Sequence, residues 1–244
     1  MLVMGFPQFQ AQDDLNFWNG GVPALEWECS PSPSSNFGSI LTSPITQNFD
    51  IDPTIREILT QLQAISRQYQ IKNQSSIQPM LTVTEVHDLA NFVLHTLLQS
   101  PRPESVASIS ECLRTGLCIY MFVLHGPTYY SHAAILNTLV LQLQHQFEML
   151  ISQEVLCKAA QVWTLSMGLV GSMGTDSHQW FLKQCAVASS RLGISDWDQI
   201  RAQLETIAWL PHMMCEMVFR QSWDAVLGTK SLLPEARVKI EIEK

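Results

Sequence analysis

Three helices can be read from residues 162–210, which run VWTLSMGLVGSMGTDSHQWFLKQCAVASSRLGISDWDQIRAQLETIAWL. The first helix is apolar, carries Trp163 and ends among glycines, which let helix ends approach closely and turn. The second is expected to stop at Gly193, because glycine readily takes the left-handed conformation that closes many helices. The third is expected to begin at Ser195, which forms a capping box with Asp198. The stretch therefore predicts three connected helices with tryptophans in their core.

Helical periodicity also covers the residues that precede this stretch. Thr82 with Glu85 forms a capping box, which is typical of a helix start. A longer helix, expected from about residue 104 to residue 124, contains the run LCIYMFVL. Because that run is apolar on all sides, the helix is expected at the centre of the fold. We therefore predict an all-α domain over residues 51–230, with about eight helices packed as an antiparallel helical array.

The two ends of the chain differ in composition from this domain. Residues 1–50 contain five acidic residues, no Lys or Arg, many Pro, Ser, Asn and Gln residues, and no helical period. Such a composition cannot bury enough apolar surface to fold, so we expect a disordered, flexible leader. Residues 231–244 are expected to form a charged C-terminal tail, since one segment of alternating residues has no strand partner.

Acidic and bulky apolar side chains lie together in the leader, in a segment formed by Asp13, Asp14, Leu15, Phe17 and Trp18. This is the composition of disordered activation segments, in which charge keeps the apolar groups in water until a partner's groove binds them. The alternative is a solvated leader whose aromatic side chains dock on the helical domain. Both interpretations stay open on the sequence.

Charge and cysteine content exclude several classes of function. The net charge is −8, and no basic face is evident that would neutralise phosphates, so direct DNA binding is not expected. The acidic balance also disfavours anionic membranes, and no stretch reaches the ~18 to 20 apolar residues of a membrane span. The six cysteines form no CxxC pair and lack the dense repeat of a binuclear zinc cluster. We interpret them as reduced thiols of an intracellular protein.

Residues suited to acid–base chemistry gather at one place only. His125, Tyr129, Tyr130 and His132 surround a Gly-Pro turn between two expected helices, where they either line a pocket or serve as polar caps. The methionines that follow His212 are interpreted as core residues rather than as ligands of a soft metal. No catalytic, cofactor-binding, metal-binding or DNA-binding residue is predicted, and an enzyme is not expected.

The spaced aromatic residues and glycines of residues 162–210 resemble the C-terminal part of the fungal-specific transcription factor domain. This is the helical regulatory region that follows the binuclear zinc cluster in fungal gene regulators, and weaker similarity extends back to about Glu104. The resemblance implies a nuclear transcriptional regulator, in a secondary-metabolite or nutrient pathway, whose domain acts through protein or ligand contacts. The residues that carry it are Trp163, Gly168, Gly171, Trp180, Phe181, Leu192, Gly193, Trp197 and Trp209.

One departure from this family is the missing zinc cluster, which usually precedes the domain. The chain is therefore expected to be a fragment or shortened product, or an accessory regulator that recruits or blocks a DNA-binding partner. Other transcription regulators or co-regulators are the expected partners, in a homodimer or a heterodimer. The low charged fraction of 15% fits a surface that another chain covers. The alternative is a small helical enzyme or ligand-binding protein with a pocket near residues 125–132.

Overall fold

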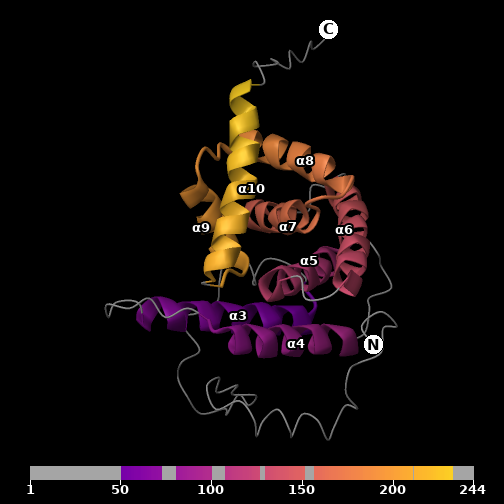
Figure 1. Ribbon diagram of the computed structural model, residues 1–244, viewed down its shortest axis with the longest axis vertical. Coiled ribbons are helices and arrows are strands. Elements are labelled where there is room, and N and C mark those ends of the chain that lie inside the picture. Colours follow the sequence, from indigo (N-terminus) through magenta and orange to yellow (C-terminus); the bar gives the residue numbers. More distant parts are fainter. Residues whose placement is uncertain are drawn as a thin grey trace, which may run out of the picture.

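The computed structural model describes residues 51–72, 81–100, 108–126, 130–151, 157–210 and 212–232. Within these residues the chain forms eight α-helices and no strand, which confirms the predicted all-α array (Figure 1). The predicted leader and residues 233–244 of the predicted tail lie outside the described residues. The helices are α3 (Pro53–Lys72), α4 (Val83–Gln99), α5 (Ile109–His125), α6 (Tyr130–Ile151), α7 (Lys158–Gly171), α8 (Ser177–Leu192), α9 (Trp197–Ile207) and α10 (Met213–Leu232).

Helix α7 lies at the centre of the array. It contacts α5, α6, α8, α9 and α10, whereas α3 and α4 lie side by side at one end of the molecule (Figure 1). Every residue of α7 after Lys158 is buried, and α5 is buried over most of its length. Since Lys158 is the only charged residue of α7, little hydration is lost when the helix leaves water. The helix predicted at the centre of the fold, α5, is therefore one of two central helices, and α7 is the other.

Capping side chains set where α4 and α9 begin. The predicted box at Thr82 and Glu85 is confirmed: the Glu85 N–H donates to the Thr82 hydroxyl at 3.3 Å, and the Thr82 N–H donates to the Glu85 carboxylate at 2.8 Å. The box predicted for Ser195 and Asp198 is wrong. Asp196 is the N-cap of α9, and its carboxylate accepts a backbone N–H of the first turn at 2.9 Å. The positive end of the helix dipole favours a carboxylate at this position. The Ser195 hydroxyl does not cap the helix and donates to the Asp196 carboxylate at 3.1 Å.

Aromatic side chains join the central helices to the link between α9 and α10. Trp163 is fully buried, as predicted, and its indole N–H donates to the Ala208 carbonyl at 2.8 Å. The Tyr120 hydroxyl accepts the Leu210 N–H at 2.8 Å, while its ring stacks on Trp209 with centroids 6.4 Å apart. Burial raises the pKa of Tyr120 well above its ordinary value, so the hydroxyl stays neutral. These contacts fix the α9–α10 link against α5 and α7.

Polar side chains attach α3 to its neighbours. The Gln63 amide donates at 2.9 Å to the carbonyls of both Thr206 and Ile207, which are orphan acceptors at the end of α9. The Tyr69 hydroxyl donates to the Glu85 carboxylate of α4 at 3.0 Å. Burial and the neighbouring Glu85 raise the pKa of Tyr69 to about 12. Hydrogen bonds as well as apolar packing thus hold α3 against α9 and α4.

The last helix corrects one expectation about the core. Met213 is 62% exposed, so its interpretation as a core residue is wrong, whereas the side chain of Met214 lies outside the described residues. Met217 is also exposed, at 53%. Because these two exposed methionines are four residues apart, they share the outer face of α10, while Phe219 and Trp223 fill its inner face. The helix also extends to Leu232, two residues beyond the predicted end of the domain.

At Gly168, α7 and α8 lie so close together that no side chain would fit at this position. A Cβ added at Gly168 would lie 2.0 Å from a ring carbon of Phe181, well inside van der Waals contact. Phe181 is itself fully buried, so its ring has little room to move away. The glycine predicted as a point of close helix approach is therefore required at this position.

We expect Gly168→Ala to lower the free energy of unfolding by about 1–3 kcal/mol, because the added methyl forces the Phe181 ring out of its packed position. The matched control is Gly228→Ala on α10, where an added Cβ meets nothing within 4 Å. There the higher helix propensity of alanine is expected to add roughly 0.5–1 kcal/mol. Urea unfolding followed by tryptophan fluorescence measures both values, and equal effects of the two substitutions would contradict the packing described.

Candidate functional site

The structure brings His125 together with a residue that the sequence did not connect to it. His125 ends α5, and its Nε2 atom lies 2.7 Å from Nδ1 of His87 on α4. Tyr129 lies outside the described residues, as do the side chains of Tyr130 and His132. The predicted grouping of these four residues therefore stays a prediction. No spacing in the sequence links His87 with His125, because their contact depends on how α4 packs against α5.

A third side chain extends the histidine pair into a hydrogen-bonded chain. Asn91 lies one turn after His87 on α4, and its amide nitrogen is 2.9 Å from His87 Nε2. The amide nitrogen is the donor in this contact, and one proton can bridge His87 Nδ1 and His125 Nε2, with the tautomer deciding which of the two nitrogens carries it. The ring centroids are 4.9 Å apart, so the two facing nitrogens lie close to the line between the ring centres. This alignment suits one shared proton.

The described residues hold no group of three or more His, Cys, Asp and Glu side chains that could bind a metal ion. In the histidine pair the two nitrogens point at each other, whereas a shared metal requires lone pairs that converge on a third point. His212 instead accepts the Cys215 N–H at 3.4 Å, which places it at the start of α10 as a cap. Burial lowers the pKa of His212, so it stays neutral in this role.

No disulfide joins the cysteines that the structure describes. Cys112 and Cys185 are fully buried, and burial raises the pKa of both groups, to about 12 for Cys112. Burial also raises the pKa of Cys215 to about 12. Because the thiolate is the reactive form of cysteine, none of these three groups is suited to nucleophilic chemistry.

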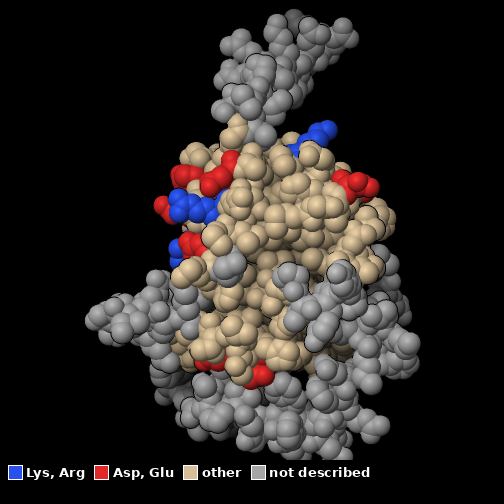
Figure 2. Space-filling view, in the orientation of Figure 1, with Lys and Arg blue, Asp and Glu red and all other residues tan. Residues whose placement is uncertain are grey.

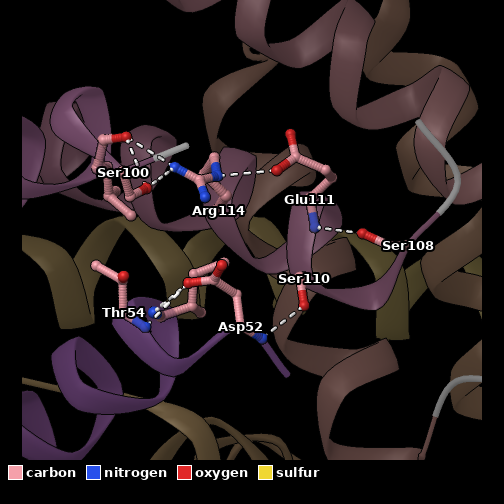
Figure 3. Close-up of polar contacts among 9 residues, drawn as sticks. Asp52, Thr54, Ser100, Ser108, Ser110, Glu111 and Arg114 are labelled. Carbon is pink, nitrogen blue, oxygen red and sulfur yellow. Dashed lines mark hydrogen bonds and ion pairs between the residues drawn. The ribbon is translucent and has the colours of Figure 1, made fainter. Parts of the chain in front are cut away.

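A buried ion pair lies where the start of α5 meets the end of α4 (Figure 3). Arg114 Nε donates to the Glu111 carboxylate at 2.9 Å, and the two side chains are only 7% and 8% exposed. The guanidinium also donates to the Leu97 carbonyl at 2.7 Å and to the Ser100 hydroxyl, so it caps the end of α4. Each charge is therefore matched by a partner within the fold.

The same junction receives the start of α3. The Asp52 N–H donates to the Ser110 hydroxyl at 2.9 Å, and the Asp52 carboxylate accepts the Thr54 N–H at 2.9 Å (Figure 3). The Ser108 hydroxyl in turn accepts the Glu111 N–H at 3.1 Å and caps α5. We call these polar residues of α3, α4 and α5 the three-helix junction: Asp52, Ser100, Ser108, Ser110, Glu111 and Arg114. Its polar groups position helices and bind one another.

Charge is sparse on the surface that the structure describes. Lys and Arg atoms gather with Asp and Glu atoms beside α9, and most of the face shown in Figure 2 carries neither charge. Arg201 illustrates the pattern: it pairs with Glu205 and with Glu216, each at 3.0 Å. A track of unpaired cations that would follow a phosphate backbone is not visible on this face. None of the described helices is long and apolar enough to cross a membrane.

Comparisons of the chain with protein-family models, with curated proteins and with solved structures found no match.

We expect Arg114→Ala to lower the free energy of unfolding by about 3–5 kcal/mol, because it leaves the Glu111 carboxylate buried without its partner. Arg201→Ala is the matched control: its ion pairs are about one-third exposed, and such pairs contribute roughly 0–1 kcal/mol. The double variant Glu111→Leu/Arg114→Met removes both charges and should recover much of the loss. Chemical denaturation of the four proteins measures these differences, and a loss at Arg114 no larger than that at Arg201 would contradict this account.

Proposed function

We propose that this protein is a transcriptional regulator of the fungal-specific transcription factor domain type, which acts through protein or ligand contacts rather than by direct DNA binding. The observation that carries the proposal is the position of residues 162–210 in the fold. Trp163 and Trp209 are core residues of the all-α array, and Gly168 is a close helix contact. Trp180 packs partly buried against this core, and Gly193 ends α8 at the surface. A location in the nucleus, with the cytoplasm, and a role in a secondary-metabolite or nutrient pathway belong to the same proposal.

The charges of the described surface support action through protein partners. Few Lys and Arg side chains are seen on the face drawn in Figure 2, and those beside α9 lie next to carboxylates, so this face offers little to a phosphate backbone. A surface poor in charge is, in contrast, easily covered by another protein, since little hydration is lost on contact. Other transcription regulators or co-regulators, among them a DNA-binding partner, are the partners we propose.

A non-enzymatic role is supported by the groups that bear chemistry. Cys112 and Cys215 have raised pKa values, and the buried charges of Glu111 and Arg114 are used to hold α4 and α5 together. The proposed activation segment from Asp13 to Trp18 lies outside the described residues, so its role rests on composition. We propose that this segment contacts the co-regulator, with docking on the helical domain as its alternative.

A second candidate function is favoured by one observation, the hydrogen-bonded chain from Asn91 through His87 to His125. A histidine oriented by a second hydrogen-bonded group is the arrangement that general acid–base catalysis uses. Under this alternative, His125 acts on a small molecule bound at the end of α5.

The whole chain, fused to a heterologous DNA-binding module, is expected to change reporter transcription several-fold, measured on both a silent and an active promoter. Replacing Phe17 and Trp18 by alanine should remove most of an activating effect, because these side chains supply the apolar contacts of the acidic segment. Phe37→Ala is the matched control, since no acidic residue flanks Phe37. A fusion inert on both promoters would contradict the proposal.

Two further measurements separate the alternatives. The unfused protein should show no saturable binding in fluorescence anisotropy with promoter-length duplexes at moderate salt; sequence-dependent binding at submicromolar protein would contradict action through partners alone. His125→Ala should leave the reporter output unchanged under the main proposal. If it abolishes that output while the melting temperature stays the same, the second candidate is favoured.

A further inference from the structure

Helix α6 presents an outer face that is almost free of charge. Its exposed side chains include Leu141 at 52% and Met149 at 44% exposure. Glu148 is the only charged residue among the 22 residues of the helix. The exposed positions between residues 133 and 149 are Ala133, Ala134, Asn137, Thr138, Leu141, Gln142, His145, Glu148 and Met149.

This face points away from the other described helices. Helix α6 runs along one side of the array, with α5 and α7 on its inner side (Figure 1). The inner positions Val140, Leu143 and Phe147 are fully buried there. A helix face exposed to water ordinarily carries charged residues, which on a soluble surface make up about 25–35% of positions. The outer face of α6 therefore has the composition of a surface that another protein covers.

The exposed residues form a regular stripe. Ala134, Thr138, Leu141 and His145 follow one another at spacings of four, three and four, and Met149 continues the row four residues later. Residues at these spacings lie above one another on a helix, as in the seam of a coiled coil. The stripe is centred on Leu141, its most apolar exposed member. Such a row can pack lengthwise against a second helix.

The stripe can pack against a second copy of itself that runs in the opposite direction. In an antiparallel pair of α6 helices with a two-fold axis at Leu141, this side chain meets Leu141 of the second copy. The small Ala134 then lies opposite the large Met149 of the other copy. Thr138 lies opposite His145: its hydroxyl donates to the Ala134 carbonyl at 3.0 Å, and its oxygen can still accept from the histidine ring.

We propose that the protein forms a homodimer in which the outer faces of α6 pack antiparallel across a two-fold axis at Leu141. The surface is then isologous, with the same patch used by both copies. Like charges do not meet in this arrangement, because the two Glu148 carboxylates are separated by roughly 20 Å along the helices. A two-helix contact belongs to the smaller interfaces, below about 1,200 Å², so the dimer dissociates on dilution. This inference does not rest on the proposed role in transcription.

Sedimentation velocity of the full chain, from micromolar to several hundred micromolar protein, tests the dimer. The wild type is expected to shift from monomer to dimer over this range. Leu141→Glu places two carboxylates opposite each other at the axis and should weaken dimerisation about tenfold or more. Val187→Glu on α8 is the matched control, because Val187 is 55% exposed and lies off the stripe. A monomer at every concentration, or a dimer unaffected by Leu141→Glu, overturns the proposal.

Cysteine cross-linking tests the register and does not depend on a charged substitution. Leu141→Cys should form an interchain disulfide with itself under mild oxidation, since the two positions face each other across the axis. Ala134→Cys and Met149→Cys should each stay uncross-linked alone and cross-link when mixed. Wild type and Val187→Cys give the background of the native cysteines. A cross-link at residue 187 as strong as that at residue 141, or no mixed product, overturns the antiparallel pairing.

Discussion

The contact between Gly168 and the Phe181 ring sets how the helices of this protein are arranged. It draws α8 onto α7 more closely than any other residue at position 168 permits. The same principle recurs twice on the central helices: an added Cβ at Gly116 would lie 2.6 Å from Trp163, and one at Gly171 would lie 2.7 Å from Ile119. Two aromatic rings and the branched side chain of Ile119 therefore occupy the space that the three glycines leave, and the helices around α7 take their positions from these contacts.

Close packing of this kind makes the centre of the protein unsuited to chemistry and well suited to a fixed shape. The groups that could react there are buried thiols with raised pKa values, and Tyr120, whose hydroxyl is bonded to the Leu210 N–H. The ionisable groups that remain accessible include the pair of His87 and His125. Function is consequently expected at the surface, through the outer faces of helices such as α6, and less in an interior pocket.

Features that depend on nearby residues could be predicted from the sequence. The Thr82 box and the stop at Gly193, where φ is 67°, follow from local side-chain and backbone chemistry, and the burial of Trp163 follows from the apolar period around it. Contacts between helices could not be predicted in this way. The bond from Arg114 to the Leu97 carbonyl depends on the packing angle of α4 and α5, as does the histidine pair. The choice of Asp196 over Ser195 as a cap was missed because both side chains can cap a helix.

The bond between the Asp52 N–H and the Ser110 hydroxyl has a mechanical consequence. The buried Ile51 and then Asp52 are the first described residues of the helical domain, and Ser110 lies in the first turn of α5, one of the two central helices. A force applied to the chain before Asp52 therefore acts on α5 directly as well as on α3. Tension on the N-terminal segment is therefore transmitted through the three-helix junction to the centre of the array by a single hydrogen bond.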